Sequence, residues 1–227
     1  MHTLMVADDH PLFREAIGAV IAAGLPGSRL LEAESLERAL QQAACHEELD
    51  LLLLDLGLPD AEGLSGLSAL REALPWLPVA IISADQERGT ILDAIALGAV
   101  GYIPKSTPRQ DLLAALTRIL EGHVYLPPDI MRRPPSPPPP GVAPPDDALG
   151  QRLAQLTDKQ LEVLVRLMRG ASNKVIAREL DIAETTVKTH VSAILRKLGV
   201  PGRVQAILAA GEADLETLLE ARRGGSS

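Results

Sequence analysis

A segment crowded with proline interrupts the chain and limits what it can fold into. Residues 127–145 contain ten prolines, four of them consecutive at 137–140. Proline removes a backbone donor and fixes φ, so no helix or sheet is expected across this composition. The sequence therefore predicts a domain at 1–126, a linker at 127–148, a second domain at 149–221 and a flexible tail at 222–227. A passive spacer is the simpler interpretation of the linker, and a ligand for a proline-binding domain is the alternative.

The two predicted domains differ in charge. Residues 1–126 carry 18 acidic and 8 basic side chains, whereas residues 151–208 carry 5 and 10, so different partners are expected. Hydrophobic residues make up 46% of the 227-residue chain but aromatic residues only 2%, so the cores must be aliphatic. The single cysteine, Cys45, excludes an intrachain disulfide and a cysteine metal cluster. Without a signal peptide or an apolar run long enough for a bilayer, we expect a cytoplasmic protein with no membrane partner.

The acidic half alternates apolar runs with stretches of helical spacing. The apolar runs predict five strands, at 3–7, 29–33, 50–56, 79–83 and 101–105. Helices are predicted after them, at 11–24, 36–44, 64–74, 90–98 and 108–122. Ser35 should cap the second helix, Gly98 should end the fourth, and Thr107 with Gln110 should form a capping box for the fifth. Because the third strand shows no polar alternation, both faces should be buried, which predicts a doubly wound parallel α/β sheet.

Polar side chains stand at the carboxyl ends of four of the predicted strands. They are Asp8, Asp9, Asp55, Ser83 and Lys105. Because the carboxyl ends of parallel strands meet at one edge of a sheet, we expect these side chains to converge. Three carboxylates held close repel one another unless a cation joins them, and carboxylate oxygens suit Mg²⁺. Asp55 could then attack phosphorus and form an aspartyl phosphate, while Ser83 and Lys105 bind phosphoryl oxygens and the Gly57 carbonyl reaches the metal.

Four stretches of this half resemble the receiver domain of bacterial response regulators. They are ADDHPLFR (7–14), LLLDLGLPDAEG (52–63), IISA (81–84) and GAVGYIPKS (98–106). The resemblance covers roughly residues 3–122 and implies the flavodoxin-like strand order 2-1-3-4-5. It also implies that a sensor histidine kinase phosphorylates Asp55, with Asp8, Asp9, Asp55 and the Gly57 carbonyl holding Mg²⁺. Ser83 and Tyr102 would be the family's switch pair, in which the hydroxyl moves toward the phosphoryl group and the aromatic ring turns inward.

One position departs from the receiver pattern. Relatives often carry a larger side chain where this chain has Gly57, so no side chain there can position or block an attacking water. Asp85, two residues after Ser83, could do either. The lifetime of the phosphoryl group is therefore left open.

The basic half predicts a helix-turn-helix. Helices are expected at 156–170, 173–180 and 184–199, with a capping box from Thr157 to Gln160 and a cap at Ser172. The third helix repeats apolar residues on one face, at Val187, Val191, Ile194 and Leu198. The side chains expected in the major groove are Lys188, Thr189, Ser192 and Arg196. Those expected at phosphates are Lys174, Arg178 and Lys197.

Residues 155–208, with LTDKQLEVLVRLMRG and ETTVKTHVSAILRKLGV, resemble the DNA-binding domain of NarL/LuxR-type regulators. The resemblance implies a four-helix domain whose last helix, near 202–210, helps two copies dimerise on double-stranded DNA. Val187, Lys188 and His190 match the family's recognition helix, although periodicity puts His190 near the core boundary. Ala183 stands where relatives usually carry a Ser or Thr cap, and Thr185 or Thr186 is expected to compensate in part. Thr185 and Thr186 are also expected to contact DNA, and His190 is expected to serve as a structural or phosphate contact. Leu215, Leu218 and Leu219 predict a further short helix.

These features predict a transcriptional response regulator that is phosphorylated on Asp55 and forms a homodimer on phosphorylation or DNA binding. Because a long linker couples two domains weakly, receiver dimerisation is favoured over relief of domain occlusion. One alternative is an atypical receiver that is never phosphorylated and dimerises constitutively. Another is a phosphatase of the aspartyl-phosphate type, which would need an acidic residue where Gly57 stands and a substrate-specificity cap. We expect no enzymatic activity beyond the chain's own phosphotransfer and autodephosphorylation.

Overall fold

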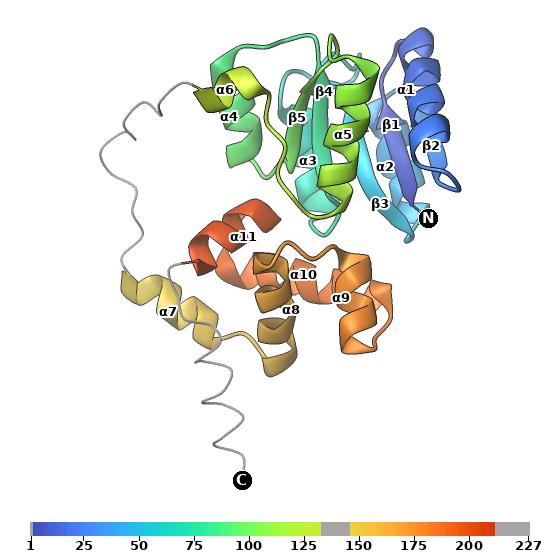
Figure 1. The fold of residues 1–227 in the computed structure, drawn as a ribbon. Helices are drawn as coiled ribbons and strands as arrows, with labels where there is room; N and C mark the ends of the chain where they lie inside the picture. The colour runs from blue at the N-terminus through green and yellow to red at the C-terminus, as the bar shows by residue number, and fades with distance from the viewer. Residues whose placement is uncertain (1, 133–145, 212–227) are drawn as a thin grey trace.

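The computed structural model describes residues 2–132 and 146–211, which form a sheet module and a helical module (Figure 1). The strands are β1 (Thr3–Ala7), β2 (Arg29–Ala33), β3 (Leu49–Leu54), β4 (Val79–Ser83) and β5 (Gly101–Pro104). The helices of the sheet module are α1 (Pro11–Gly24), α2 (Leu36–Cys45), α3 (Ser65–Ala73), α4 (Arg88–Ala96) and α5 (Arg109–Leu120). All neighbouring strands pair in parallel in the order β2-β1-β3-β4-β5, as expected.

The strand β3 explains why this sheet carries helices on both faces. Leu51 and Leu53 join a buried cluster with α1 and α5, whereas Leu52 and Leu54 join a second cluster with α2, α3 and α4. All four side chains are at most 1% exposed. Successive side chains of a strand point to opposite faces, so an unbroken leucine run can only be buried between two helical layers.

Several predicted element ends are confirmed and one is wrong. The Ser35 hydroxyl accepts a hydrogen bond from the Arg38 backbone N–H, and Gly98 follows α4 with φ of +97°. The predicted Thr107 capping box is absent, because α5 begins after Pro108 without a side-chain cap. The Thr107 N–H instead donates to the Pro104 carbonyl at 3.0 Å, which uses this residue in the turn after β5.

The predicted linker begins with a helix, which the sequence prediction missed. Helix α6 (Pro128–Arg132) starts with proline, which the first turn of a helix tolerates because its N–H would have no intrahelical partner. Just before it, Tyr125 bridges Gly101 in parallel and accepts the Tyr102 N–H at 2.9 Å, so it covers the free edge of β5. Ile130 packs against the core cluster on the α4 side of the sheet. The prolines at 134–145 lie outside the described residues.

The helical module contains α7 (Asp146–Ala154), α8 (Asp158–Met168), α9 (Asn173–Leu180), α10 (Glu184–Leu198) and α11 (Arg203–Ala210). The predicted apolar face of α10 is buried in its core, together with Leu161, Leu164 and Ile176. The Thr157 capping box and the Ser172 cap are both present, whereas Ala183 at the N-cap of α10 makes no side-chain capping hydrogen bond. Helix α7 was not predicted. The predicted helix near Leu215 lies outside the described residues.

The two modules contact each other mainly through α10 and α11, which lie at one end of the sheet, and α9 adds one ion pair (Figure 1). Gln205 of α11 donates to the Ile95 carbonyl, and Val204 joins the core cluster between the sheet and α5. The contacted segments precede β3, β4 and β5, so this seam lies at the amino ends of the strands. Across residues 2–132 and 146–211, no helix is both long enough and apolar enough to cross a membrane.

Candidate functional site

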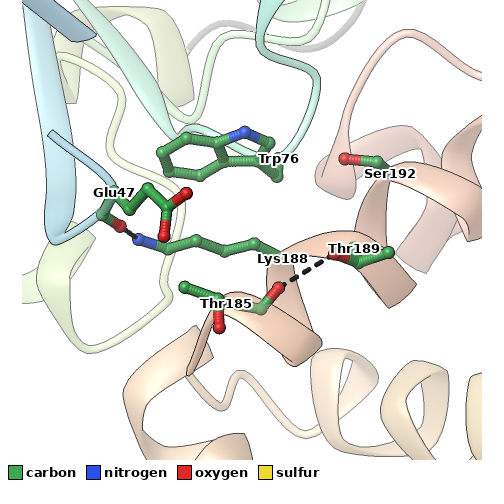
Figure 2. Close-up of a pocket in the computed structure, with 6 residues that line it drawn as sticks. All are labelled: Glu47, Trp76, Thr185, Lys188, Thr189 and Ser192. Atoms are coloured by element: carbon green, nitrogen blue, oxygen red, sulfur yellow. Dashed lines mark hydrogen bonds between the residues drawn. The ribbon is translucent and has the colours of Figure 1, made fainter. Parts of the chain in front are cut away.

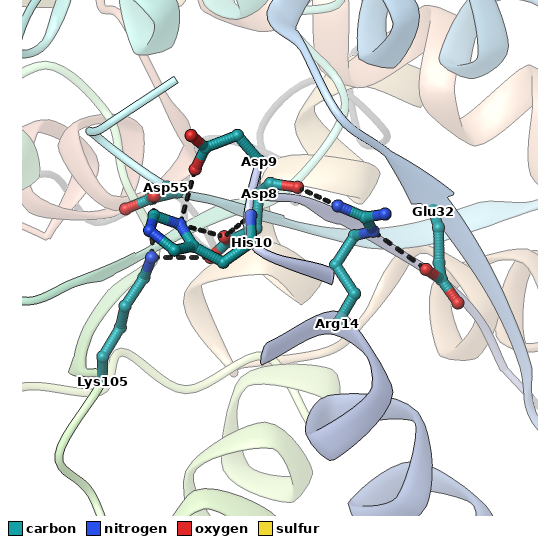
Figure 3. A network of polar contacts seen from close by, with 7 residues as sticks. All are labelled: Asp8, Asp9, His10, Arg14, Glu32, Asp55 and Lys105. Carbon is teal, nitrogen blue, oxygen red and sulfur yellow. Dashed lines mark hydrogen bonds and ion pairs between the residues drawn. The ribbon is translucent and has the colours of Figure 1, made fainter. Parts of the chain in front are cut away.

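The carboxyl ends of β1 and β3 bring three carboxylates together (Figure 3). The Asp55 N–H donates to the Ala7 carbonyl at 2.9 Å, which fixes the height of Asp55 beside the end of β1. One ligand atom each of Asp8, Asp9, His10 and Asp55 lies within 4.8 Å of the others. Asp8 is fully buried and Asp55 is 4% exposed, whereas Asp9 is open to solvent. The convergence expected for residues 47 positions apart is therefore present.

Lys105, which follows β5, bridges two of these carboxylates. Its Nζ lies 2.7 Å from Asp8 Oδ2 and 2.8 Å from Asp55 Oδ2. Burial acts to lower the pKa of Lys105, but the hydrogen bonds and charges of Asp55 and Asp8 outweigh it, so the pKa is raised above its usual value. The ammonium group is therefore held charged at the place where a phosphoryl oxygen on Asp55 would need a cation.

The carboxylate of Asp55 faces a pocket of about 440 Å³ whose lining includes His10, Gly57, Ser83 and Lys105. A Cβ atom at Gly57 would lie 3.2 Å from Asp55 Oδ2, closer than most real contacts of that kind. Glycine therefore keeps the approach to Asp55 clear. Ser83 is 5% exposed, and its hydroxyl accepts the Asp85 N–H at 3.2 Å. The pocket is large enough for a phosphoryl group and presents the hydroxyl and ammonium expected to bind it.

Tyr102 of β5, the expected switch aromatic, is fully buried, and its hydroxyl donates to the Asp85 carbonyl at 2.8 Å. Burial raises the pKa of its phenol. The ring therefore already occupies the inward position that the family resemblance assigned to the phosphorylated state.

The donor set at this edge of the sheet fits a small divalent cation. Asp8, Asp9 and Asp55 supply carboxylate oxygens, the ligands that Mg²⁺ prefers. Lys105 offsets only one of the three negative charges. The remaining negative charge, concentrated beside an open pocket, favours a bound cation.

The expected DNA-contacting side chains fall into two groups. Lys174, Arg178, Thr185, Thr186, Thr189 and Arg196 are exposed, and His190 and Ser192 are half-buried. Lys197 is committed within its own module, because its Nζ donates to the Gln155 carbonyl at 2.9 Å and to Gln160 Oε1 at 2.8 Å. Lys197 thus links the end of α10 to α8. The sequence had instead predicted a contact with a DNA phosphate.

Lys188, expected to enter the major groove, instead points into the sheet module (Figure 2). The residue is 5% exposed, its Nζ donates to the Glu47 carbonyl, and Nζ lies 4.3 Å from the centre of the Trp76 ring. Trp76, Glu47 and Lys188 line a cavity of about 290 Å³ together with Thr185, Thr189 and Ser192 of α10. In this arrangement the sheet module covers Lys188, whereas Thr185, Thr186 and Arg196 of the same helix stay exposed. The only sequence signal for this contact was an unexplained tryptophan, the sole one in the chain.

A second contact holds α9 against the sheet module. Lys174 Nζ lies 3.5 Å from Asp50 Oδ2, at the start of β3. The same carboxylate oxygen accepts the Thr3 N–H at 3.0 Å. Lys188 and Lys174, both expected to contact DNA, therefore contact Glu47 and Asp50, which lie just before β3 and at its start.

Comparison with known proteins agrees with this division. Residues 4–117 match the response regulator receiver domain, and residues 154–210 match the luxR family of bacterial regulatory proteins. A glycerol metabolism activator of Pseudomonas putida is 52% identical over 225 residues, 96% of this chain and 99% of the relative. The nitrate/nitrite response regulator protein NarL of Escherichia coli K12 is 32% identical over 205 residues, 90% of this chain and 92% of NarL.

Among solved structures, a LuxR family DNA-binding response regulator from Silicibacter pomeroyi is similar with a TM-score of 0.51. It shares 33% sequence identity, and the match covers 57% of this chain and 99% of that one. The two matched families account for the sheet module and the helical module separately. The chain therefore belongs to the DNA-binding response regulators of the NarL/LuxR type, in which a receiver domain is joined to a LuxR-type helix-turn-helix.

Proposed function

We propose that a sensor histidine kinase phosphorylates Asp55 in the presence of Mg²⁺, and that this modification controls DNA binding by α10. The observation that carries the proposal is the convergence of Asp8, Asp9 and Asp55 around a pocket that also presents Lys105. The expected domain boundaries, with a receiver at 1–126 and a DNA-binding domain at 149–221, remain part of this proposal.

The phosphotransfer uses groups that line the pocket. A carboxylate oxygen of Asp55 forms the new bond to phosphorus, the phosphorus–nitrogen bond of the kinase phosphohistidine breaks, and the imidazole leaves with its electron pair. Lys105 would bind one phosphoryl oxygen and the Ser83 hydroxyl would donate to another. Asp8, Asp9, Asp55 and the Gly57 carbonyl would hold Mg²⁺, which supplies positive charge beside the transferred group.

The output step is a change in the contact between the two domains. The closed arrangement uses Lys188 for contacts with Glu47 and Trp76, so the same side chain cannot contact DNA. Phosphorylation would shift a pre-existing equilibrium toward an open form. Because of these contacts we propose that the domains separate first. The weak coupling expected from the long linker had favoured receiver dimerisation as the first step. Dimerisation through the receiver or through α11 would follow and would bring two recognition helices to double-stranded DNA.

The target genes are proposed from the relative at 52% identity. That protein is named a glycerol metabolism activator, so we propose that this chain activates transcription of genes for glycerol use. Because its proposed ligand is chromosomal DNA, the place of action would be the cytoplasm. A genome-wide pull-down with the phosphorylated chain tests this assignment, and recovery of promoters unrelated to glycerol use would contradict it.

Labelling by acetyl phosphate tests the phosphoacceptor. Wild type with Mg²⁺ should gain one phosphoryl group by intact-mass measurement, and Asp55→Asn should gain none. Asp93→Asn, which removes an exposed carboxylate on α4, is the matched control and should label like wild type. Label retained in Asp55→Asn would refute the site.

Two alternatives predict different outcomes. An atypical receiver would bind DNA as a dimer yet show no label on wild-type Asp55 and no response to beryllofluoride. A phosphatase would release phosphate from small esters with repeated turnover. We propose no such activity, since Gly57 stands where the general acid would be needed. Sustained hydrolysis of a phosphate ester by the full chain would overturn that part of the proposal.

A further inference from the structure

His10 is held against the acidic cluster by two carboxylates, although nothing in the proposed phosphotransfer uses it. Its Nδ1 lies 2.6 Å from Asp9 Oδ1 and 3.1 Å from Asp8 Oδ1 (Figure 3). Its own backbone N–H donates to Asp8 Oδ1 at 2.8 Å, which fixes the turn that aims the ring at the cluster. The ring is nevertheless 66% exposed, so burial does not hold it in place.

Local structural duties do not account for this ring. His10 is the residue that precedes α1, but its side chain makes no capping hydrogen bond to the helix. The first turn of α1 is held by the His10 carbonyl, which accepts from Phe13 and Arg14. What places the ring is its pair of contacts with Asp8 and Asp9, and its nitrogen lies among the same atoms that would surround a cation.

The four groups differ in the metals that they suit. Carboxylate oxygens bind Mg²⁺ and Mn²⁺ alike, whereas imidazole nitrogen binds transition metals and is not a ligand that Mg²⁺ prefers. A site with three carboxylates and one imidazole therefore offers a transition metal one more ligand than it offers Mg²⁺.

We propose that His10 Nδ1 is a protein ligand for transition-metal ions such as Mn²⁺ at the Asp8, Asp9 and Asp55 site, and that it makes the site favour them over Mg²⁺. The inference rests on the proposed metal site and deepens it by naming the ligand that sets metal selectivity. Coordination uses the lone pair of Nδ1, so the ring carries its proton on Nε2 and Nδ1 gives up its polar contacts with the two carboxylates. The ring needs little displacement, because it already lies within 4.8 Å of the other ligand atoms.

Pulsed electron paramagnetic resonance of the full chain loaded with Mn²⁺ tests this directly. Wild type should show the nuclear coupling of a coordinated ¹⁴N, and His10→Asn should lose that coupling while still binding Mn²⁺. His46→Asn is the matched control, because His46 Nδ1 also lies near a carboxylate two residues away, Glu48 Oε1 at 3.2 Å, but outside the cluster. Its signal should equal that of wild type.

Calorimetric titration gives the selectivity. In His10→Asn the affinity for Mn²⁺ should fall by about tenfold, whereas the affinity for Mg²⁺ should change by less than about twofold. Bound Mn²⁺ without coordinated nitrogen, or nitrogen coupling that persists in His10→Asn, would overturn the role of His10 and leave the proposed metal site standing. Failure of wild type to bind either ion would overturn the metal site and this inference together.

Discussion

At the scale of single residues, Lys105 is the side chain on which the acidic cluster depends. Asp8 and Asp55 are almost fully buried, and each has a carboxylate oxygen within 2.8 Å of its ammonium group. Two buried carboxylates without a cation would repel one another in a poorly solvated place. Lys105 therefore stabilises the metal-free form, and a phosphoryl group on Asp55 would compete for the same ammonium.

Replacing Lys105 should leave the repulsion between the buried carboxylates without a compensating charge. Lys105→Met should lower the free energy of unfolding of the metal-free protein by roughly 3 kcal/mol, the lower end for breaking a buried ion pair. Denaturant unfolding measures this, and Mg²⁺ should stabilise the variant more than wild type because it replaces the lost cation. The double variant Lys105→Met/Asp55→Asn is the control and should recover part of the loss.

The pH dependence follows from the raised pKa of Lys105. A lysine whose pKa is raised on folding contributes stability that is fully present below the unfolded value of about 10.4, and this contribution is lost as the pH rises through the folded pKa. The difference between wild type and Lys105→Met should therefore persist through neutral and mildly alkaline pH. A difference that disappears near pH 8 would show that the ammonium is not what holds the carboxylates.

At the scale of elements, β3 connects the two functional regions. The carbonyl oxygen of Leu49, the first residue of β3, lies 3.4 Å from Lys188 Nζ, and Asp55 directly follows the last residue of the strand. Five steps along a strand span roughly 17 Å. Lys188 of the predicted recognition helix is thus docked at the amino end of the strand whose carboxyl end carries Asp55, the proposed phosphoacceptor. Any signal between them must pass through the sheet or around its helices.

Trp76 supplies one of the contacts that dock α10, because its ring faces the Lys188 ammonium. Trp76→Leu removes the cation–π contact, so the unphosphorylated chain should bind DNA more tightly, by about threefold to tenfold. Fluorescence anisotropy with a promoter fragment selected by the phosphorylated protein measures the change.

Trp76→Phe keeps an aromatic face and is the matched control, with a smaller expected gain. Equal affinities for wild type and Trp76→Leu would mean that this contact does not limit DNA binding.

At the scale of the whole molecule, the seam between the domains combines close backbone contact with buried charge. Arg71 and Arg203 lie buried near it, each with one carbonyl partner, and burial lowers the pKa of each guanidinium to about 10. Buried cations without a carboxylate partner are costly. The cost of burying these two charges lowers the stability of the contact between the domains, so the contact can be released more easily.

A side chain added at Gly202 should separate the two domains, because the backbones are in close contact there. A Cβ atom at Gly202 would lie 2.8 Å from the Cα and carbonyl oxygen of Gly98 in the other domain. Gly202 has an extended backbone, with φ of −162°, so alanine adds no backbone strain there, although a poorer helix N-cap could cost about 1 kcal/mol. Gly202→Ala should enlarge the radius of gyration measured by X-ray scattering and raise the DNA affinity of the unphosphorylated chain.

Gly150→Ala is the control for this variant, because a Cβ atom at Gly150 meets nothing within 4 Å. It should match wild type in both measurements. An unchanged radius and DNA affinity in Gly202→Ala would argue that closure does not restrict the DNA-binding domain.

The sequence by itself determined the parallel sheet, the helix-turn-helix and the edge at which the polar side chains gather. Strand burial, helical spacing and caps such as Ser35 and Thr157 are local signals, and the position of Asp55 at the end of a parallel strand follows from topology. These features depend on neighbours in the chain or on a rule of the fold, so they can be read without coordinates.

Only the tertiary structure decided that Lys188 packs on Trp76, that Tyr125 covers the edge of β5, and that His10 turns toward the carboxylates. A lysine on an exposed helix face suits a DNA phosphate and a backbone carbonyl equally well, so its type and spacing do not identify the partner. Contacts between surfaces far apart in sequence leave no periodic pattern. Their choice rests on shape and charge that exist only once both domains have folded.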